Sequence, residues 1–179
     1  PQPGIDSRHL RVHRNRTGSC DERSSDAQQI GSQVVTFEVR DSTIRDVTCG
    51  ERVVIMQPSN VYEAILGDDV FVGPFCEIQE GVSIGQRTRV QSHTFICELV
   101  TVGEDCFIGH GVMFVNDRMR GGPALGDRDK WERTFVGDWV SIGSNATILP
   151  VRICSEVVIG AGSVVTADIV EPGTYVGNP

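Results

Sequence analysis

The sequence predicts an all-β protein, a solenoid of short parallel strands that is interrupted by one long loop. A six-residue repeat runs without a break from Leu66 to Phe114, with a long or branched apolar residue at its first position every time. The chain has 20 glycines but only 6% aromatic residues. This composition is typical of tight, repetitive β structure, and a six-residue period is too short for a helical repeat.

The repeat predicts which residues form the core. From residue 66 it reads LGDDVF, VGPFCE, IQEGVS, IGQRTR, VQSHTF, ICELVT, VGEDCF, IGHGVM and FVNDRM. Three hexads make one triangular coil of 18 residues, so first positions stack in ladders. We expect one ladder of Val72, Val90 and Ile108 and a second of Ile78, Ile96 and Phe114. The fifth position also faces inward near a corner and is small: Cys76, Thr88, Thr94, Cys106, Ala146.

Glycine follows the first position in five of the nine hexads. We expect these glycines to turn the corners of the coil with a positive φ, which glycine adopts at little cost. A β-sandwich would instead require alternating runs with turns every 8–12 residues. The unbroken hexads favour the solenoid.

The repeat also predicts the domain boundaries. Residues 51–179 form the β-helix domain, with a projecting polar loop at 117–133, after which the hexads resume and lose one residue near Pro150. A loop of this length is often functional. Residues 1–50 are a polar segment, disordered or accessory. In residues 33–58, apolar and polar side chains alternate weakly, which predicts strands that enter the main body.

Charge and hydrophobicity exclude several classes of partner. The net charge is −8, from 16 Lys and Arg against 24 Asp and Glu, so the basic stripe of a nucleic-acid-binding protein is missing. No apolar run reaches the length of a membrane span, and the first residues have no apolar signal core. We therefore expect a cytoplasmic protein without nucleic-acid or membrane partners. Cys76 and Cys106 at inward positions predict buried, reduced thiols.

Two histidines lie in the repeat region. His93 is the fourth residue of its hexad and His110 the third, and Ser92 precedes His110 by one coil. One coil therefore brings both imidazoles to one outward corner, with Ser92 and His110 as hydrogen-bond partners that could fix the His93 tautomer. An imidazole suits general acid–base work near neutral pH. Equally, a corner histidine can simply hydrogen-bond its surface neighbours.

Five motifs carry a resemblance to a known family. They are GPFCEIQ (73–79), VQSHTFICE (90–98), GHGVMFVNDR (109–118), VSIGSNATILP (140–150) and VIGAGSVVTADI (158–169). The sequence resembles the hexapeptide-repeat acyltransferases over about residues 53–179, which implies a left-handed parallel β-helix. Within that family it is most similar to the N-acetyltransferases that act on a 3-amino or 4-amino group of a nucleotide-linked deoxysugar.

The resemblance implies an activity and an assembly. The activity is transfer of an acetyl group from acetyl-CoA to an amino group of a nucleotide-linked amino sugar, in the biosynthesis of surface polysaccharide such as lipopolysaccharide O-antigen. The assembly is a homotrimer with active sites between subunits, and we expect loop 117–133 to reach a neighbouring subunit because it is too long and charged to fold on its own coil. His93 would face the acceptor amine, with His110 as the second catalytic candidate.

The resemblance also suggests ligand contacts. Asn116 and Asp117 border the acceptor sugar in the family, although an Asn-Asp pair equally starts a turn. Glu77 and Gln91 are outward polar residues near the same region. The coenzyme would be held mostly by main-chain N–H groups, at small residues that allow its close approach. These residues are Ser144, Ala146, Ala161 and Gly162. The corners of a solenoid require small residues in any case, which explains them equally well.

Two other functions stay open at this point. One is an O-acetyltransferase of the same fold, acting on serine or a sugar hydroxyl, for which Asp117 beside His93 could make a stronger base. The other is a non-catalytic β-helix scaffold. A metal site is not expected, because the zinc site of the γ-class carbonic anhydrases, which share this fold, requires three histidines and the repeat region has two.

Overall fold

The structure, a computed structural model, describes residues 27–30, 33–36 and 44–178 and divides the chain into two compact units, Pro1–Asp41 and Ser42–Pro179. In the first unit, β1 (Ala27–Ile30) pairs antiparallel with β2 (Gln33–Thr36). Residues 33–36 thus form a strand, as their alternation predicts, but its partner is β1 in the first unit and not a strand of the solenoid. Of the segment 1–50 that was expected to be disordered or accessory, residues 1–26, 31–32 and 37–43 lie outside the described part of the chain.

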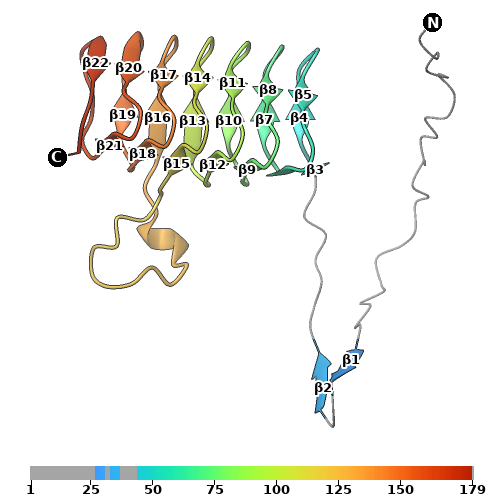
Figure 1. The fold of residues 1–179 in the computed structure, drawn as a ribbon. Coiled ribbons are helices and arrows are strands. Elements are labelled where there is room, and N and C mark those ends of the chain that lie inside the picture. The colour runs from blue at the N-terminus through green and yellow to red at the C-terminus, as the bar shows by residue number, and fades with distance from the viewer. Residues whose placement is uncertain (1–26, 31–32, 37–43, 179) are drawn as a thin grey trace, which may run out of the picture. The chain divides into compact units, whose positions relative to one another are not determined.

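The second unit is a solenoid of three parallel sheets (Figure 1). The first sheet contains β3 (Ile44–Arg45), β6 (Asn60–Tyr62), β9 (Glu77–Ile78), β12 (Phe95–Ile96), β15 (Met113–Phe114), β18 (Thr147–Ile148) and β21 (Val164–Val165). The second contains β4 (Thr48–Cys49), β7 (Ile65–Leu66), β10 (Ser83–Ile84), β13 (Val100–Val102), β16 (Thr134–Val136) and β19 (Arg152–Ile153). The third contains β5 (Val54–Ile55), β8 (Phe71–Val72), β11 (Arg89–Val90), β14 (Phe107–Ile108), β17 (Ser141–Ile142), β20 (Val157–Ile159) and β22 (Gly173–Tyr175).

This architecture confirms the predicted β-helix and moves its start. The strands β3 and β4 pair with β6 and β7 in the solenoid sheets. The domain therefore begins by Ile44 and not at residue 51. The first coil was missed because residues 44–55 contain a single glycine, Gly50, and lack the strict hexad spacing of later coils.

The predicted core ladders are present. Val90 is in register with Val72 on one side and Ile108 on the other, and all three are fully buried. Ile96 is in register with Ile78, and Phe114 follows in the next coil. The small fifth-position residues Cys76, Thr88, Thr94, Cys106 and Ala146 are buried as predicted. Hydrophobic burial along these ladders stabilises the solenoid.

The predicted coil length of 18 residues holds in the middle of the solenoid, for example between Arg87 and Asp105. The first coil is shorter, with 17 residues between Arg52 and Asp69. The coil that contains Pro150 is also 17 residues long, as the separation of Asp138 and Ser155 shows. This agrees with the loss of one residue from the hexad pattern near Pro150.

The structure corrects the role of the second-position glycines, because none of Gly67, Gly73, Gly85, Gly103 and Gly109 has a positive φ. A Cβ on Gly85 would lie 2.5 Å from the carbonyl carbon of Gly103. Glycine is therefore required at position 85 because the backbone of the next coil approaches so closely. The left-handed residue is instead the fourth of most hexads, with φ between 55° and 73°: Asp69, Phe75, Gly81, Arg87, His93, Leu99, Asp105, Gly111, Trp139, Asn145, Glu156 and Gly162.

Loop 117–133 projects between β15 and β16 and contains one short 3-10 helix, η1 (Arg128–Lys130) (Figure 1). Its base is tied to the solenoid, because Arg118 donates from Nη1 to the carbonyl of Thr166 at 3.2 Å and from Nη2 to that of Pro150. The N–H of Glu132 donates to the carbonyl of Asn116 at 2.8 Å and closes the loop.

The loop also contacts the preceding coils of its own chain. Arg128 donates from Nη2 to Glu98 at 3.0 Å and to Glu80 at 3.2 Å. These two carboxylates lie one coil apart at the corner between the first and second sheets. The prediction that this loop could not fold on its own coil is therefore wrong at this contact, because two stacked acidic residues provide a partner for its arginine.

Candidate functional site

The two repeat histidines lie at one corner, between the third and first sheets, which we call the histidine corner. His93 connects β11 to β12, and His110 connects β14 to β15 in the next coil. The N–H of Gly111 donates to the carbonyl of Ser92 at 3.0 Å, which places the two coils in the predicted register. Both histidines are exposed, so the sequence correctly placed them together and facing solvent.

The immediate partner of the His93 imidazole is an aromatic ring. The ring of Phe75, one coil earlier, stacks on it with centroids 4.9 Å apart and planes at 24°. The predicted partners were Ser92 and His110, but in the described part of the chain the structure gives the imidazole no hydrogen bond to either. Phe75 lies within the GPFCEIQ motif, where nothing in the residue pattern gave it a role.

The histidine corner continues as one column of main-chain hydrogen bonds through the later coils. The N–H of Asn145 donates to the carbonyl of His110 at 2.8 Å, and that of Gly162 donates to Ser144 at 2.9 Å. An elongated ligand along this corner would pass from His93 to the region of Gly162. A Cβ added at Gly162 would meet no atom within 4 Å, so the surface there is open.

Two of the four small residues that were expected to lie beside the coenzyme have main-chain N–H groups that already bond within the solenoid. The N–H of Ala146 donates to the carbonyl of Gly143 at 3.3 Å, and its side chain is fully buried. The N–H of Gly162 is occupied by Ser144. Both N–H groups are used in hydrogen bonds within the solenoid, so neither is free to donate to a ligand. Ser144 is partly exposed and Ala161 is exposed, so these two residues remain accessible at the corner.

Asn116 and Asp117 lie away from the histidine corner. They follow β15, whereas His110 precedes it, so the first sheet separates the pair from the histidines within one chain. The Asp117 carboxylate accepts a hydrogen bond from the N–H of Met119 at 2.7 Å, the contact of an Asn-Asp turn. Asp117 is therefore not beside His93 in the same chain, and the stronger base suggested for hydroxyl acceptors is not formed there.

Glu77 and Gln91 lie close to the histidine corner. Glu77 is on β9, beside Phe95 in the sheet register, and its carboxylate accepts a hydrogen bond from Gln79 Nε2 at 2.8 Å. The residue Gln91 follows β11, and its main-chain carbonyl accepts a contact from the thiol of Cys76 at 3.1 Å. Both side chains are partly exposed and could reach a ligand at the corner.

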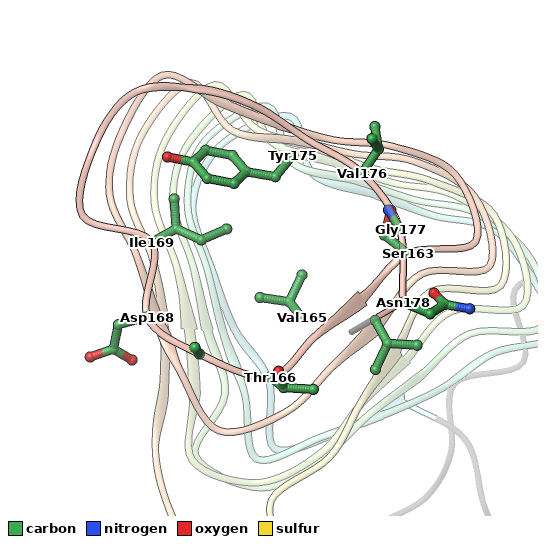
Figure 2. Close-up of a pocket in the computed structure, with 11 residues that line it drawn as sticks. Ser163, Val165, Thr166, Asp168, Ile169, Tyr175, Val176, Gly177 and Asn178 are labelled. Atoms are coloured by element: carbon green, nitrogen blue, oxygen red, sulfur yellow. The ribbon is translucent and has the colours of Figure 1, made fainter.

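A pocket of about 450 Å³ lies elsewhere, at the last turn of the solenoid (Figure 2). Its lining includes the core residues Val165 and Ile169, together with Asp168, Tyr175 and Val176. The pocket is thus the exposed end of the hydrophobic prism, and none of the predicted catalytic residues lines it.

Two further absences concern the described residues. Between residues 44 and 178 and in the β1–β2 hairpin, no three His, Cys, Asp or Glu side chains gather in a way that could hold a metal ion. Within the same stretches, no helix is both long enough and apolar enough to cross a membrane.

Comparison with known proteins identifies two repeat segments. Residues 63–98 match the family described as "Bacterial transferase hexapeptide (six repeats)", and residues 133–167 match "Hexapeptide repeat of succinyl-transferase". Among curated proteins, the bifunctional protein GlmU of Thermotoga petrophila is 33% identical over 144 residues, which cover 70% of this chain and 30% of that protein. The chain thus spans less than a third of the length of such relatives.

Solved structures share the fold. A mutant of AntD, an N-acyltransferase from Bacillus cereus in complex with dTDP and coenzyme A, is 23% identical with a TM-score of 0.66, covering 74% of this chain and 80% of that one. A mutant of perosamine N-acetyltransferase from Caulobacter crescentus, in complex with CoA and GDP-perosamine, is 18% identical with a TM-score of 0.51, covering 76% and 54%. At these identities the likeness establishes the β-helix fold.

Proposed function

Because the chain belongs to the hexapeptide-repeat transferases, we propose that it transfers an acetyl group from acetyl-CoA to the amino group of a nucleotide-linked amino sugar. The observation that carries this proposal is the histidine corner, where His93 and His110 lie exposed on neighbouring coils. AntD and perosamine N-acetyltransferase, which share the fold, were solved with coenzyme A and with a nucleotide or nucleotide sugar. The product would enter surface-polysaccharide synthesis in the cytoplasm.

The proposed reaction requires one proton to move at the histidine corner. The neutral amine nitrogen attacks the thioester carbonyl carbon, the carbon–sulfur bond breaks, and CoA leaves with the sulfur electrons. The nitrogen then carries an extra proton, which His93 accepts and passes to the departing thiolate or to solvent. His93 is suited to this step because its ring is exposed and lies outside the apolar prism.

The position of Asn116 and Asp117 supports an assembly. Within one chain the first sheet separates these residues from His93, so they can border the same acceptor only if a second copy brings its loop to the histidine corner. We therefore include a homotrimer with active sites between subunits in the proposal. Sedimentation equilibrium tests it, and a monomer at micromolar concentration would contradict it.

Subunit mixing tests the shared site more directly. His93→Ala and Asp117→Ala subunits are each expected to have low activity when assembled alone. After the two are unfolded and refolded together, mixed trimers would contain some interfaces with both native residues and regain activity. If the mixture stays as inactive as its parents, the site does not combine these residues from two chains.

Thiol release from acetyl-CoA, measured with a panel of acceptors, tests the chemistry. Release that depends on an aminosugar nucleotide supports the proposal, whereas release with serine or sugar hydroxyls alone would favour O-acetylation. A maltose O-acetyltransferase from Clostridium difficile also shares the fold, at 21% identity and a TM-score of 0.53, so both acceptor classes belong in the panel. Failure of CoA to raise the thermal midpoint, with no thiol release, would indicate a scaffold.

A further inference from the structure

Phe75 lies at the histidine corner in a way that folding alone does not require. Its side chain is 57% exposed, so it adds little to the buried core. Its backbone is left-handed, with a φ of 61°, where a side chain larger than that of glycine or asparagine is disfavoured. At this same corner, later coils carry Gly111, Asn145 and Gly162.

The contact that Phe75 makes is specific. Its ring stacks on the imidazole of His93 at a centroid distance of 4.9 Å, with the two planes inclined by only 24°. The main chain reinforces the pairing, because the N–H of His93 donates to the carbonyl of Pro74 at 3.2 Å. An exposed imidazole on a surface turn would otherwise exchange rotamers freely. A parallel stack covers one face of the ring and leaves its nitrogen-bearing edge uncovered.

We propose that Phe75 is a positioning residue for His93, a role that rests on the proposed acetyl transfer. Its ring holds the imidazole plane in the orientation from which a nitrogen reaches the acceptor amine. Proton transfer depends steeply on such alignment, and a displacement of about 1 Å can lower a rate by ~10²-fold. The left-handed phenylalanine is thus kept for the reaction at the expense of the fold.

Phe75→Gly separates the two roles. It removes the ring and relieves the left-handed backbone, so the thermal midpoint should stay the same or rise. The kcat should fall about 10- to 100-fold, by the alignment argument, with little change in KM for acetyl-CoA. Phe75→Tyr keeps the stacked ring and should restore most of kcat. A residue with only a structural role would show the opposite pattern, a lower midpoint with unchanged kcat.

Trp139→Gly is the matched control. Trp139 is also an exposed aromatic residue, 66% accessible, at a left-handed fourth position with a φ of 58°, but it lies on the corner between the second and third sheets. Its replacement should change the thermal midpoint as Phe75→Gly does and leave kcat unchanged. A fall of kcat in both variants would point to a general effect of the corners and overturn the proposal.

A double-mutant cycle establishes that Phe75 acts through His93. In a His93→Ala background, Phe75→Gly should lower kcat no further, because the positioned ring is already absent. A further loss would mean that Phe75 contacts the substrate directly and would overturn the positioning role, as would Phe75→Gly with wild-type kcat. NMR supplies a readout without turnover, since the His93 ring protons should move downfield when the Phe75 ring current is lost.

The outcomes distinguish this inference from the proposed function. If the wild-type protein transfers no acetyl group to any amine, the proposed function fails and this inference fails with it. If the wild-type protein is active and the Phe75 variants keep its kcat, only the positioning role fails.

Discussion

Arg87 donates two hydrogen bonds to the Asp105 carboxylate one coil further along the solenoid, from Nε and Nη2, each 2.7 Å long. Arg52 binds Asp69 in the same paired geometry, also at 2.7 Å for both bonds. All four are left-handed fourth-position residues at the corner between the second and third sheets. The coil repeat thus places side chains of opposite charge directly over one another.

These pairs predict an acid-sensitive part of the stability. The guanidinium of Arg87 lowers the pKa of Asp105 below its ordinary value of 3.8, chiefly through the hydrogen bond, and Arg52 does the same for Asp69. Stability from a lowered carboxyl pKa is present above about pH 4 and lost as pH falls through the folded-state pKa. The thermal midpoint should therefore fall with acidification below pH 4.

Arg87→Gln should reduce that acid-dependent fall, since the Asp105 pKa returns toward its ordinary value. The effect at neutral pH should be small and weaken with added salt, because both side chains contact solvent. Thermal melts of the variant and the wild-type protein from pH 7 to pH 3 measure it. Identical pH profiles would show that the pair adds nothing.

The second-position glycines should tolerate no side chain. In Gly85→Ala the new Cβ would lie 2.5 Å from the carbonyl carbon of Gly103, and backbone cannot move aside as a flexible side chain does. We expect a loss of about 1–3 kcal/mol in the free energy of unfolding, the range for overpacked sites. Gly81→Ala is the comparison, because its Cβ meets open space and only the left-handed backbone, with a φ of 73°, opposes it. Urea unfolding of both variants measures the two losses. A larger loss for Gly85→Ala would show that the close backbone contact costs more than the left-handed backbone does.

Arg128 should hold the loop against the solenoid. Burial raises the pKa of Glu98, and the positive charge of Arg128 opposes that rise. Arg128→Ala removes the contacts to Glu98 and Glu80 and should speed chymotrypsin cleavage after the exposed Leu125 by about two- to fivefold, the range for exposed ion pairs. Lys130→Ala, which removes only the contact with Asp127 inside the loop, should leave the cleavage rate unchanged. Equal rates in all three proteins would show that the loop is held by other contacts.

His93→Ala should lower kcat for acetyl transfer by about 10²-fold, within the usual range for loss of a general base. The KM for acetyl-CoA should change little, because the proposed coenzyme contacts lie in later coils. Steady-state kinetics from about pH 6 to pH 9 measure both constants. If the variant keeps the wild-type kcat throughout this range, the acceptor amine reacts in its neutral form and loses its proton without His93.

The thiols should differ sharply in reactivity. Burial raises the pKa of Cys97 to about 12 and also raises the pKa values of Cys76 and Cys106. Cys49 is exposed. Among Cys49, Cys76, Cys97 and Cys106, native labelling with iodoacetamide followed by mass spectrometry should modify Cys49 first and Cys97 last, whereas labelling in urea should modify these four equally. Rapid native labelling of Cys97 would show that the solenoid opens at that coil.

The predictable part of this structure is the part that six-residue spacing determines. Spacing identifies Val90 as a core residue and His93 as an outward one, because each position of a hexad always faces the same way. The reason for Gly85 could not be seen, since it depends on how closely the next coil approaches. The fourth position gave no signal either, because the residue there varies from Asp69 to Trp139 although the backbone is left-handed in most coils.

Contacts that depend on the path of the loop could not be predicted from the sequence either. Glu80 and Glu98 are one coil apart, so their stacking could have been predicted, but nothing periodic connects them to Arg128. The same holds for Asp117, whose place in the chain is close to the histidine motifs while the first sheet lies between them. The stack of Phe75 on His93 follows from the coil repeat, yet the choice of an aromatic residue there is not a consequence of the repeat.

The loop between β15 and β16 lengthens one link in the chain without altering the sheets. Glu104 and Asp138, 34 residues apart, occupy neighbouring coils just as residues 18 apart do elsewhere. Doubling the length of a flexible connection adds only about 0.6 kcal/mol of closure entropy. Loop length and composition can therefore drift in evolution at small thermodynamic cost, while the spacing of the coils cannot.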